Sequence, residues 1–192
     1  MRLQQCLTLT LALTLLLGCA PRRLAAPGGV TLKPGDYVEG SYRVPDFNPQ
    51  QVSFALEPFT VERARGVAPN TIQDLLQQEL AKALANNGLS TTPSTEQPAC
   101  QLSGTVEKVQ VRGTSLRWLI GKITADLTIS GTIRRGEEVL FAFQDRVRIV
   151  SPLNPGPTPP LETELLLRQV VHTFAIHLMN EILIQGFAAE GG

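Results

Sequence analysis

The chain has 192 residues, with 17 lysines and arginines against 17 aspartates and glutamates, so its formal net charge at pH 7 is zero. A neutral chain with no basic stripe along its sequence lacks the electrostatic footprint of a nucleic-acid-binding protein, which excludes that class of partner. The length suits one domain with a hydrophobic core and an attached segment.

The first 18 residues have the pattern of a secretory signal peptide. Arg2 supplies a positive charge, and an uncharged apolar run follows over residues 7–17. A membrane-spanning helix needs roughly 20 apolar residues, so this run is too short to cross a bilayer. We therefore set residues 1–18 aside as a cleaved segment, which leaves 16 basic against 17 acidic residues.

The apolar run ends at Leu16-Leu17-Gly18-Cys19. These residues resemble the lipobox of bacterial lipoproteins, in which a small residue precedes the cysteine that becomes the new N-terminus. The resemblance implies a triacylated Cys19, and more than one acyl chain makes such an anchor stable. Ala20 stands where an aspartate would retain a lipoprotein in the inner membrane, which implies the periplasmic face of the outer membrane. An uncleaved anchor with an incidental cysteine is the alternative.

Residues 19–50 are expected to form a flexible tether between the lipid and the folded domain. The stretch shows little hydrophobic periodicity and is rich in proline, namely Pro21, Pro27, Pro34, Pro45 and Pro49. Of the three cysteines, Cys6 leaves with the signal and Cys19 carries lipid, so Cys100 stands alone. We expect Cys100 to be buried and unpaired at the start of a strand, and a disulfide between two chains is the alternative.

Residues 51–188 are expected to form a single α+β periplasmic domain. Its first strand begins near Val52 and is interrupted at Pro58, which favours an edge position or a bulge. A helix with one apolar face follows over residues 70–87, with Asn70 as its N-cap and Gly88 as its C-terminal stop.

Three strands are expected next, over residues 102–111, 123–133 and 139–149. The apolar alternation changes phase near Glu107-Lys108, which predicts a β-bulge, and Arg135-Gly136 predicts a tight turn. A proline-rich connection over 151–160 leads to a last helix over 161–185. The expected fold is therefore an antiparallel sheet of four to five strands with two helices packed on one face, in the order β-α-β-β-β-α.

This order behind a lipobox resembles a group of small periplasmic outer-membrane lipoproteins of the LptE-like, PqiC-like, LpoB-like and curli-assembly kinds. The resemblance rests on a helix that ends at Asn87-Gly88-Leu89 and on the strand Leu102-Ser103-Gly104-Thr105-Val106. It implies a protein without enzymatic activity that docks on, plugs or regulates a larger envelope machine.

The sequence contains no combination of residues that we would assign to a catalytic site, so we expect no enzyme. His172 and His177 are five residues apart on one helix and so point to different faces, and His177 with Glu181 lacks a third metal ligand. We expect no metal and no cofactor beyond the covalent lipid. Asp145 interrupts the apolar side of its strand, and Arg117 or Arg134 could pair with it.

The connection between the first two strands of the meander is unusually apolar. Between Gly113 and Gly121 it holds the residues predicted to bind a partner, namely Leu116, Arg117, Trp118, Leu119 and Ile120. Such a segment either folds back over the core or presents an apolar tip to a partner or a lipid, and a cavity for a small molecule is a third interpretation.

We expect a lipid-anchored accessory subunit of an envelope assembly or transport machine, with lipopolysaccharide or lipid transport favoured. It would bind one larger envelope protein through residues 116–120 together with a sheet edge or the last helix, and the tether would raise the local concentration. A periplasmic carrier of lipid or another apolar ligand and an activator of a cell-wall synthase are the alternatives.

Overall fold

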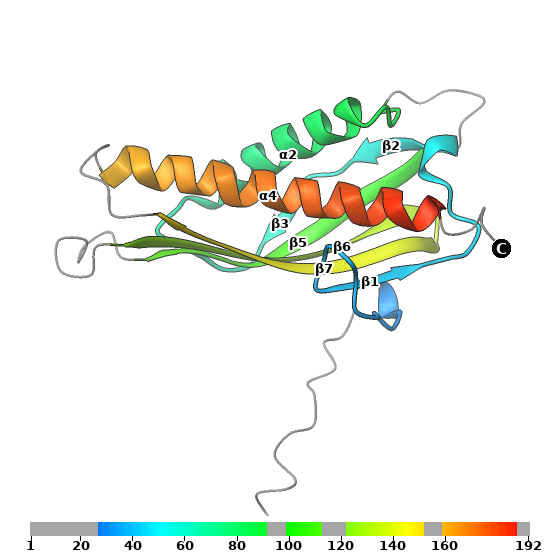
Figure 1. The fold of residues 1–192 in the computed structure, drawn as a ribbon, viewed down its shortest axis with the longest axis horizontal. Coiled ribbons are helices and arrows are strands. Elements are labelled where there is room, and N and C mark those ends of the chain that lie inside the picture. Colours follow the sequence, from blue (N-terminus) through cyan, green and yellow to red (C-terminus); the bar gives the residue numbers. More distant parts are fainter. Residues whose placement is uncertain (1–26, 92–98, 113–121, 152–158, 188–192) are drawn as a thin grey trace, which may run out of the picture.

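The computed structural model describes residues 27–91, 99–112, 122–151 and 159–187. Its elements follow one another in the order η1 (Pro27–Gly29), β1 (Gly40–Arg43), η2 (Pro49–Gln51), β2 (Ser53–Leu56), β3 (Thr60–Val61), β4 (Ala64–Arg65), α2 (Pro69–Asn86), β5 (Ala99–Arg112), β6 (Ile123–Arg135), β7 (Glu138–Ser151) and α4 (Pro159–Phe187). Helices α2 and α4 lie side by side over one face of the sheet (Figure 1). The α+β layering expected from the sequence is therefore confirmed.

The sheet is mixed, which corrects the expected antiparallel sheet of four to five strands. Strands β5, β6 and β7 form the antiparallel meander, and the seven strands follow the order β1-β7-β6-β5-β2 with β3 and β4 also paired to β5. All three of β2, β3 and β4 run parallel to β5. The reason is α2, because a helix between two strands of one sheet carries the chain back to its starting end.

The interruption of the first strand at Pro58 is confirmed. Residues 57–59 separate β2 from β3, and β2 forms one end of the strand order. Proline lacks the N–H that a continuous ladder requires, so the chain pairs with β5 in short segments on either side of it. The expected bulge is also present, because the β5–β6 register shifts between Val106 and Lys108.

Helix α2 begins one residue earlier than expected, and the predicted cap is wrong. Ala68 is the N-cap and Pro69 occupies the first turn, so no side chain caps the helix. Proline suits the first helical position because the missing N–H has no partner there. Gln73, the expected partner of Asn70, instead donates a hydrogen bond from Nε2 to the carbonyl oxygen of Phe59 at 2.8 Å. Gly88 has a φ of 69°, as expected of a residue that ends a helix.

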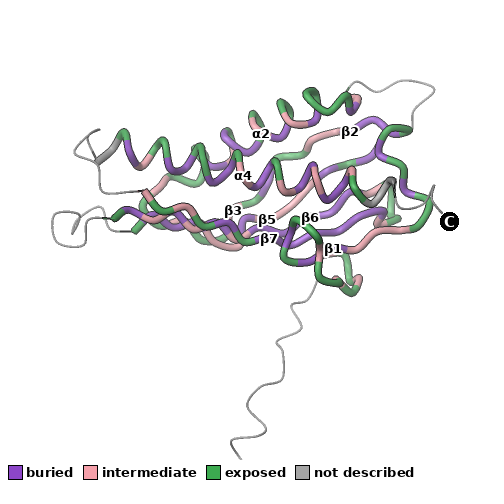
Figure 2. The backbone as a smooth tube through the Cα atoms, viewed as in Figure 1, coloured by how far each residue is buried: buried purple, intermediate pink, exposed green. Residues whose placement is uncertain are grey.

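The core lies between the sheet and the two helices, whose inner sides are buried and whose outer sides are exposed (Figure 2). Its largest fully buried side chains include five aromatic rings, Phe54, Phe59, Phe141, Phe143 and Phe174. Phe59 and Phe143 have room because glycines lie beneath them in paired positions on β5 and β6. A Cβ at Gly104 would meet Phe59 at 2.4 Å, and one at Gly131 would meet Phe143 at 2.5 Å.

The packed part of the chain begins well before residue 51, so the expected tether over residues 19–50 is too long. Val38 and Phe47 are buried in the core, and β1 pairs with β7. Prolines in this stretch suggested an extended chain, yet they alternate with apolar side chains that cover the β1 edge and one end of the core. Of the expected tether, residues 19–26 lie outside the described residues.

None of the helices in the described ranges combines the length and the apolar character that crossing a membrane requires.

Candidate functional site

The two histidines of α4 bind different neighbours, as their spacing predicted. His172 Nδ1 lies 2.8 Å from Glu79 Oε2 on α2, and His177 Nδ1 lies 2.9 Å from Asp145 Oδ2 on β7. Each imidazole therefore links α4 to another element. Within the described part of the chain no group of three or more His, Cys, Asp or Glu residues could hold a metal ion.

Asp145 is buried on the helix-facing side of β7, and its partners differ from those expected. Arg117 lies outside the described residues, and Arg134 lies on the opposite face of β6 because its position alternates with that of Ile133. Asp145 instead accepts hydrogen bonds from His177 and from the backbone N–H of Arg146. Burial raises the pKa of this carboxyl group, and the hydrogen bond from His177 offsets part of that increase.

Glu181, on α4, is another buried carboxylate, and it holds the N-terminal segment against the helix. Its Oε2 accepts hydrogen bonds from the backbone N–H groups of Asp36 and Tyr37 at 2.9 and 2.8 Å. Its Oε1 accepts a hydrogen bond from the hydroxyl of Ser41 on β1 at 2.6 Å. The side chain is 0% exposed, so these three donors satisfy a charge that water does not reach. A Cβ at Gly35 would meet Oε1 at 2.9 Å, so this approach also requires a glycine.

Sequence reasoning considered Glu181 only as an incomplete zinc ligand and missed this role. The available signal was an acidic residue within the apolar face of a long helix, next to Leu178 and Ile182. A carboxylate in that position must find donors from another element, and the sequence does not say which element supplies them.

Arg43 makes a second attachment between β1 and the C-terminal part of α4. Its guanidinium donates to the carbonyl oxygen of Ile182 at 2.8 Å, donates to the carbonyl oxygen of Phe47, and lies 5.1 Å from the centre of the Phe47 ring. Burial lowers the pKa of this arginine. The end of α4 and the segment around β1 therefore form one rigid corner of the domain.

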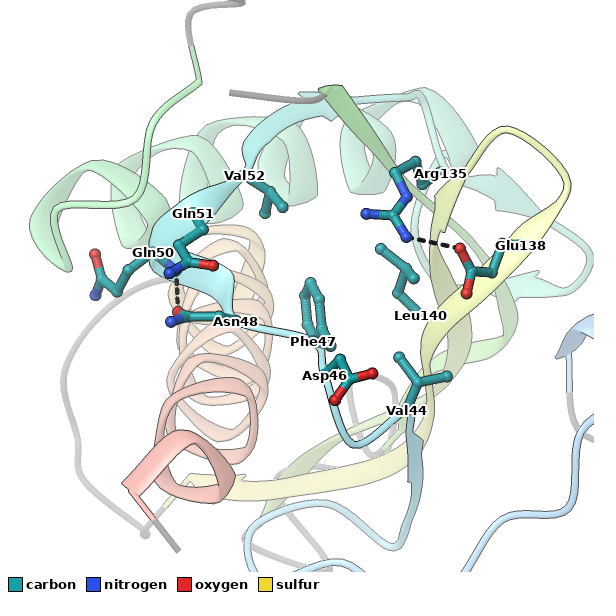
Figure 3. A pocket seen from close by; sticks show the side chains of 10 residues that line it. All are labelled: Val44, Asp46, Phe47, Asn48, Gln50, Gln51, Val52, Arg135, Glu138 and Leu140. Atoms are coloured by element: carbon teal, nitrogen blue, oxygen red, sulfur yellow. Dashed lines mark hydrogen bonds and ion pairs between the residues drawn. The ribbon is translucent and has the colours of Figure 1, made fainter. Parts of the chain in front are cut away.

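A pocket of about 610 Å³ opens beside this corner, between residues 44–52 and the β6–β7 hairpin (Figure 3). The Phe47 ring lies at its centre, and Arg135 binds Glu138 at 2.8 Å on the hairpin side. On the other side Asn48 accepts a hydrogen bond from the backbone N–H of Gln50 at 3.0 Å. Its lining combines apolar side chains with the charged groups of Asp46, Arg135 and Glu138, and contains no histidine, serine or cysteine.

The outer surface of α4 carries exposed apolar side chains. Four of them are more than two-fifths exposed and recur along the outward side of the helix, namely Leu161, Leu165, Ile176 and Ile184. Between α2 and α4, Ile176 and Met179 line a groove of about 120 Å³ whose other side includes Lys82 and Asn86. Single exposed apolar side chains are ordinary on protein surfaces, so this side of α4 is a candidate contact and not a defined apolar patch.

The site residues predicted from the sequence lie outside the described residues. They are Cys19 and the five residues Leu116, Arg117, Trp118, Leu119 and Ile120. The structure does describe both ends of the strands that this connection joins, because Arg112 ends β5 and pairs with Thr124 near the start of β6. The end of β5 at Arg112 and the start of β6 at Ile123 therefore lie at one end of the sheet, opposite the end that carries the β6–β7 hairpin.

No protein-family model and no curated protein matches the chain. Solved structures do match in fold. A Xanthomonas campestris protein of the DUF330 family aligns with a TM-score of 0.51 at 10% identity, over 78% of this chain and 94% of that one. A minor lipoprotein of Acinetobacter baumannii aligns with a TM-score of 0.45 at 18% identity, over 65% and 88% of the two chains.

The rare lipoprotein B of Shewanella oneidensis aligns with a TM-score of 0.45 at 13% identity, over 68% of this chain and 98% of that one. At these identities the likeness to the Xanthomonas protein shows a shared fold and leaves function open.

Proposed function

We propose that this protein is a lipid-anchored lipoprotein of the bacterial envelope that acts without enzymatic activity as an accessory subunit of an assembly or transport machine. The observation that carries this proposal is the segment Leu16-Leu17-Gly18-Cys19 behind an 11-residue apolar run. An anchor formed by acyl chains on Cys19 would place the α+β domain at the periplasmic face of the outer membrane. Transport of lipopolysaccharide or lipid is the favoured pathway.

The filled core favours an adaptor over a carrier of apolar ligands. A carrier needs an internal cavity, whereas the layer between sheet and helices holds six buried phenylalanines that belong to one hydrophobic cluster. The rings of Phe47, Phe141, Phe143 and Phe174 follow one another across this layer with centroids 5.8–6.4 Å apart. An apolar ligand would have to displace these contacts.

The partner would contact the apolar segment 116–120, with the outer face of α4 or a sheet edge as a second contact. The exposed side chains of Leu161, Leu165 and Ile176 support the helix as that second contact. A membrane anchor restricts the domain to a thin layer at the lipid surface, so a modest interface suffices for stable association.

The test is crosslinking in intact cells, followed by purification of the lipoprotein with its covalently captured partners. Three proteins are compared with Cys19 intact in each, namely the wild type, Trp118→Ala and Ile176→Ser. We expect the wild type to capture one dominant envelope protein and Trp118→Ala to lose most of it. Gln78→Ser, an exposed change on α2 away from the groove, is the matched control and should capture as much as the wild type.

Capture retained in Trp118→Ala but lost in Ile176→Ser would move the interface from the loop to α4. The absence of a dominant partner in all three proteins would contradict the adaptor. Lipid extracted in a stoichiometric amount from protein purified without detergent would then support the carrier.

A further inference from the structure

Basic side chains gather at one end of the sheet face that the helices leave uncovered, which we call the open face. Strand registers place five of them there, because each pairs with Gln110, Thr124, Asp126 or Thr128. These four positions alternate along their strands with Val109, Ala125 and Leu127, which are buried under the helices. The five basic residues are Arg65, Lys108, Arg112, Arg146 and Arg148. Successive residues of a strand point to opposite faces, so none of these five points toward the helices.

Few acidic groups balance these cations. Asp126 lies among them and binds Arg148 Nε at 3.0 Å, with Arg112 Nε at 3.8 Å. Both arginine side chains are more than half exposed, so these pairs remain open to other anions. Glu107, at the bulge, accepts a hydrogen bond from Gln144 Nε2 at 3.4 Å. Among the described residues of this part of the face, five basic against two acidic groups leave a net charge of +3.

The chain enters the domain on the same face. Residues Pro27–Gly29 contact β6 and β7 near the β6–β7 hairpin. A Cβ at Gly28 would lie 2.9 Å from Val139 and 3.5 Å from Thr132, and both side chains belong to the open face. The described chain therefore begins on the open face and not in the helix layer.

The distance from Pro27 to the anchor is short. Seven residues lie between Cys19 and Pro27, which makes eight steps along the chain. A fully extended chain spans at most about 3.5 Å per step, or about 28 Å in total. A segment of this length allows the open face to reach the lipid surface, and the helices lie on the other side of the sheet from the point where the described chain begins (Figure 1). Electrostatic attraction acts within about 10 Å, which a tether of this length permits.

We propose that the open face is a docking surface for the anionic headgroups of the bilayer in which the protein is anchored, so that the helices and their apolar outer face point away from the membrane. The proposal rests on the lipid anchor of the proposed function. Arg65, Lys108, Arg112, Arg146 and Arg148 supply the charge, and the short segment before Pro27 supplies the orientation. Each basic residue near an anionic surface strengthens association about fivefold.

The experiment uses the full lipidated protein, reconstituted in vesicles of phosphatidylcholine with or without phosphatidylglycerol. One cysteine is introduced either on the open face, by Thr128→Cys, or on the helix layer, by Gln78→Cys. Its rate of reaction with a membrane-impermeant maleimide is then measured. Cys100 does not interfere, because it is fully buried and burial raises the pKa of its thiol.

We expect phosphatidylglycerol to slow labelling at Thr128→Cys at least tenfold and to leave labelling at Gln78→Cys unchanged. Adding Lys108→Gln with Arg146→Gln should restore fast labelling, because two lost charges weaken the contact about 25-fold. Lys82→Gln with Arg168→Gln is the matched control, since it removes the same charge from the helix layer. High salt should also restore labelling.

Flotation of the vesicles separates the two possible failures. Protein that does not float with either kind of vesicle lacks the anchor, and the docking proposal fails with the proposed function. Protein that floats but labels at Thr128→Cys equally fast in both kinds of vesicle overturns the docking surface alone, which would leave these cations for an acidic protein partner. The docking surface is also overturned if labelling at Thr128→Cys is slow but its rate depends neither on phosphatidylglycerol nor on the charge changes.

Discussion

Glu181 shows how one buried charge decides where a chain segment lies. The carboxylate is completely buried on α4, and its three donors come from residues that are about 140 positions earlier in the chain. A buried charge is tolerated only where donors surround it, so this residue requires the N-terminal segment to pack against the helix. The domain consequently begins before β1 and not at residue 51.

Replacing Glu181 by glutamine tests this role. Glutamine keeps the shape but turns an amide N–H₂ group toward backbone donors, which leaves at least one of them unsatisfied. We expect Glu181→Gln to lower the free energy of unfolding by about 2 kcal/mol, measured by urea denaturation. Glu164→Gln is the control, because Glu164 pairs with Arg168 at the surface and should contribute less than about 0.5 kcal/mol. Equal effects of the two changes would contradict the role of Glu181.

Asp145 predicts a dependence of stability on pH. Its pKa is raised by burial in the folded state, so between the unfolded and folded pKa values the folded protein binds more protons than the unfolded chain. Stability supplied by this group is thus complete below the unfolded pKa and is lost as the pH rises through the folded pKa.

Asp145→Asn cannot titrate, so its free energy of unfolding relative to the wild type should increase as the pH rises from about 3 toward neutral. Urea denaturation over this pH range measures the difference. A difference that stays constant or decreases would show that the pKa of Asp145 is not raised.

At the scale of elements, the glycines of β5 and β6 explain how large rings fit over the middle of the sheet. Gly104 and Gly131 pair with each other, and Phe59 and Phe143 occupy the space that side chains would take. A Cβ at Gly104 would also lie 2.5 Å from the carbonyl oxygen of Ser130, which belongs to the neighbouring strand and cannot move independently. Alternation of apolar residues predicted both strands, and the structure shows that the two glycines within them make room for the rings.

Gly104→Ala should therefore overpack the core and lower the free energy of unfolding by about 1–3 kcal/mol. Thermal or urea denaturation measures this loss. Ser103→Ala, on the next residue and the opposite face, is the matched control and should change stability by less than about 0.5 kcal/mol. A neutral Gly104→Ala would show that Phe59 does not occupy this space.

Helix α2 allows a test by stabilisation, because its N-terminus lacks a side-chain cap that a substitution can supply. Ala68 already has the extended backbone of an N-cap, with φ −76° and ψ 138°. In Ala68→Ser, the hydroxyl oxygen should accept a hydrogen bond from a free backbone N–H in the first turn of α2. We expect this bond to raise the free energy of unfolding by about 1 kcal/mol. Ala81→Ser, at an exposed position inside the same helix, is the control and should lower it by a few tenths of a kcal/mol, about 0.5 at most. Stabilisation by both changes would contradict the capping explanation.

At the scale of the whole molecule, the chain is neutral in total yet separates its charges in space. Five basic residues from three strands share one end of the open face, although they are distributed from residue 65 to residue 148. These positions are not neighbours in the chain, so they form no basic stripe in the sequence. Pairing of β4, β5, β6 and β7 brings them together.

The anchor itself is testable at this scale. Cys19→Ser removes the only thiol that the lipobox offers for acylation, so incorporation of labelled palmitate and flotation with membranes should both be abolished. Cys6→Ser is the matched control, because Cys6 lies within the signal segment, and both readouts should match the wild type. Labelling that persists in Cys19→Ser would contradict the lipobox interpretation.

Local patterns in the sequence determined much of the fold. Apolar alternation located β5, β6 and β7, the phase change located the bulge near Glu107, Pro58 located the break at the sheet edge, and helical spacing located α2 and α4. These features depend on residues within a few positions of one another, so the sequence contains them directly. The lipobox is local in the same sense, and the proposed anchor follows from it.

Only the tertiary structure decided which distant residues meet. The parallel direction of β2, β3 and β4, the attachment of Asp36 and Tyr37 to Glu181, the Asp145–His177 contact and the basic end of the open face all join residues far apart in the chain. A buried carboxylate requires donors and a strand requires a neighbour, but many segments of one chain could satisfy either need. Packing of the whole domain selects among them, because a side chain finds its long-range partners only when all the elements are in place.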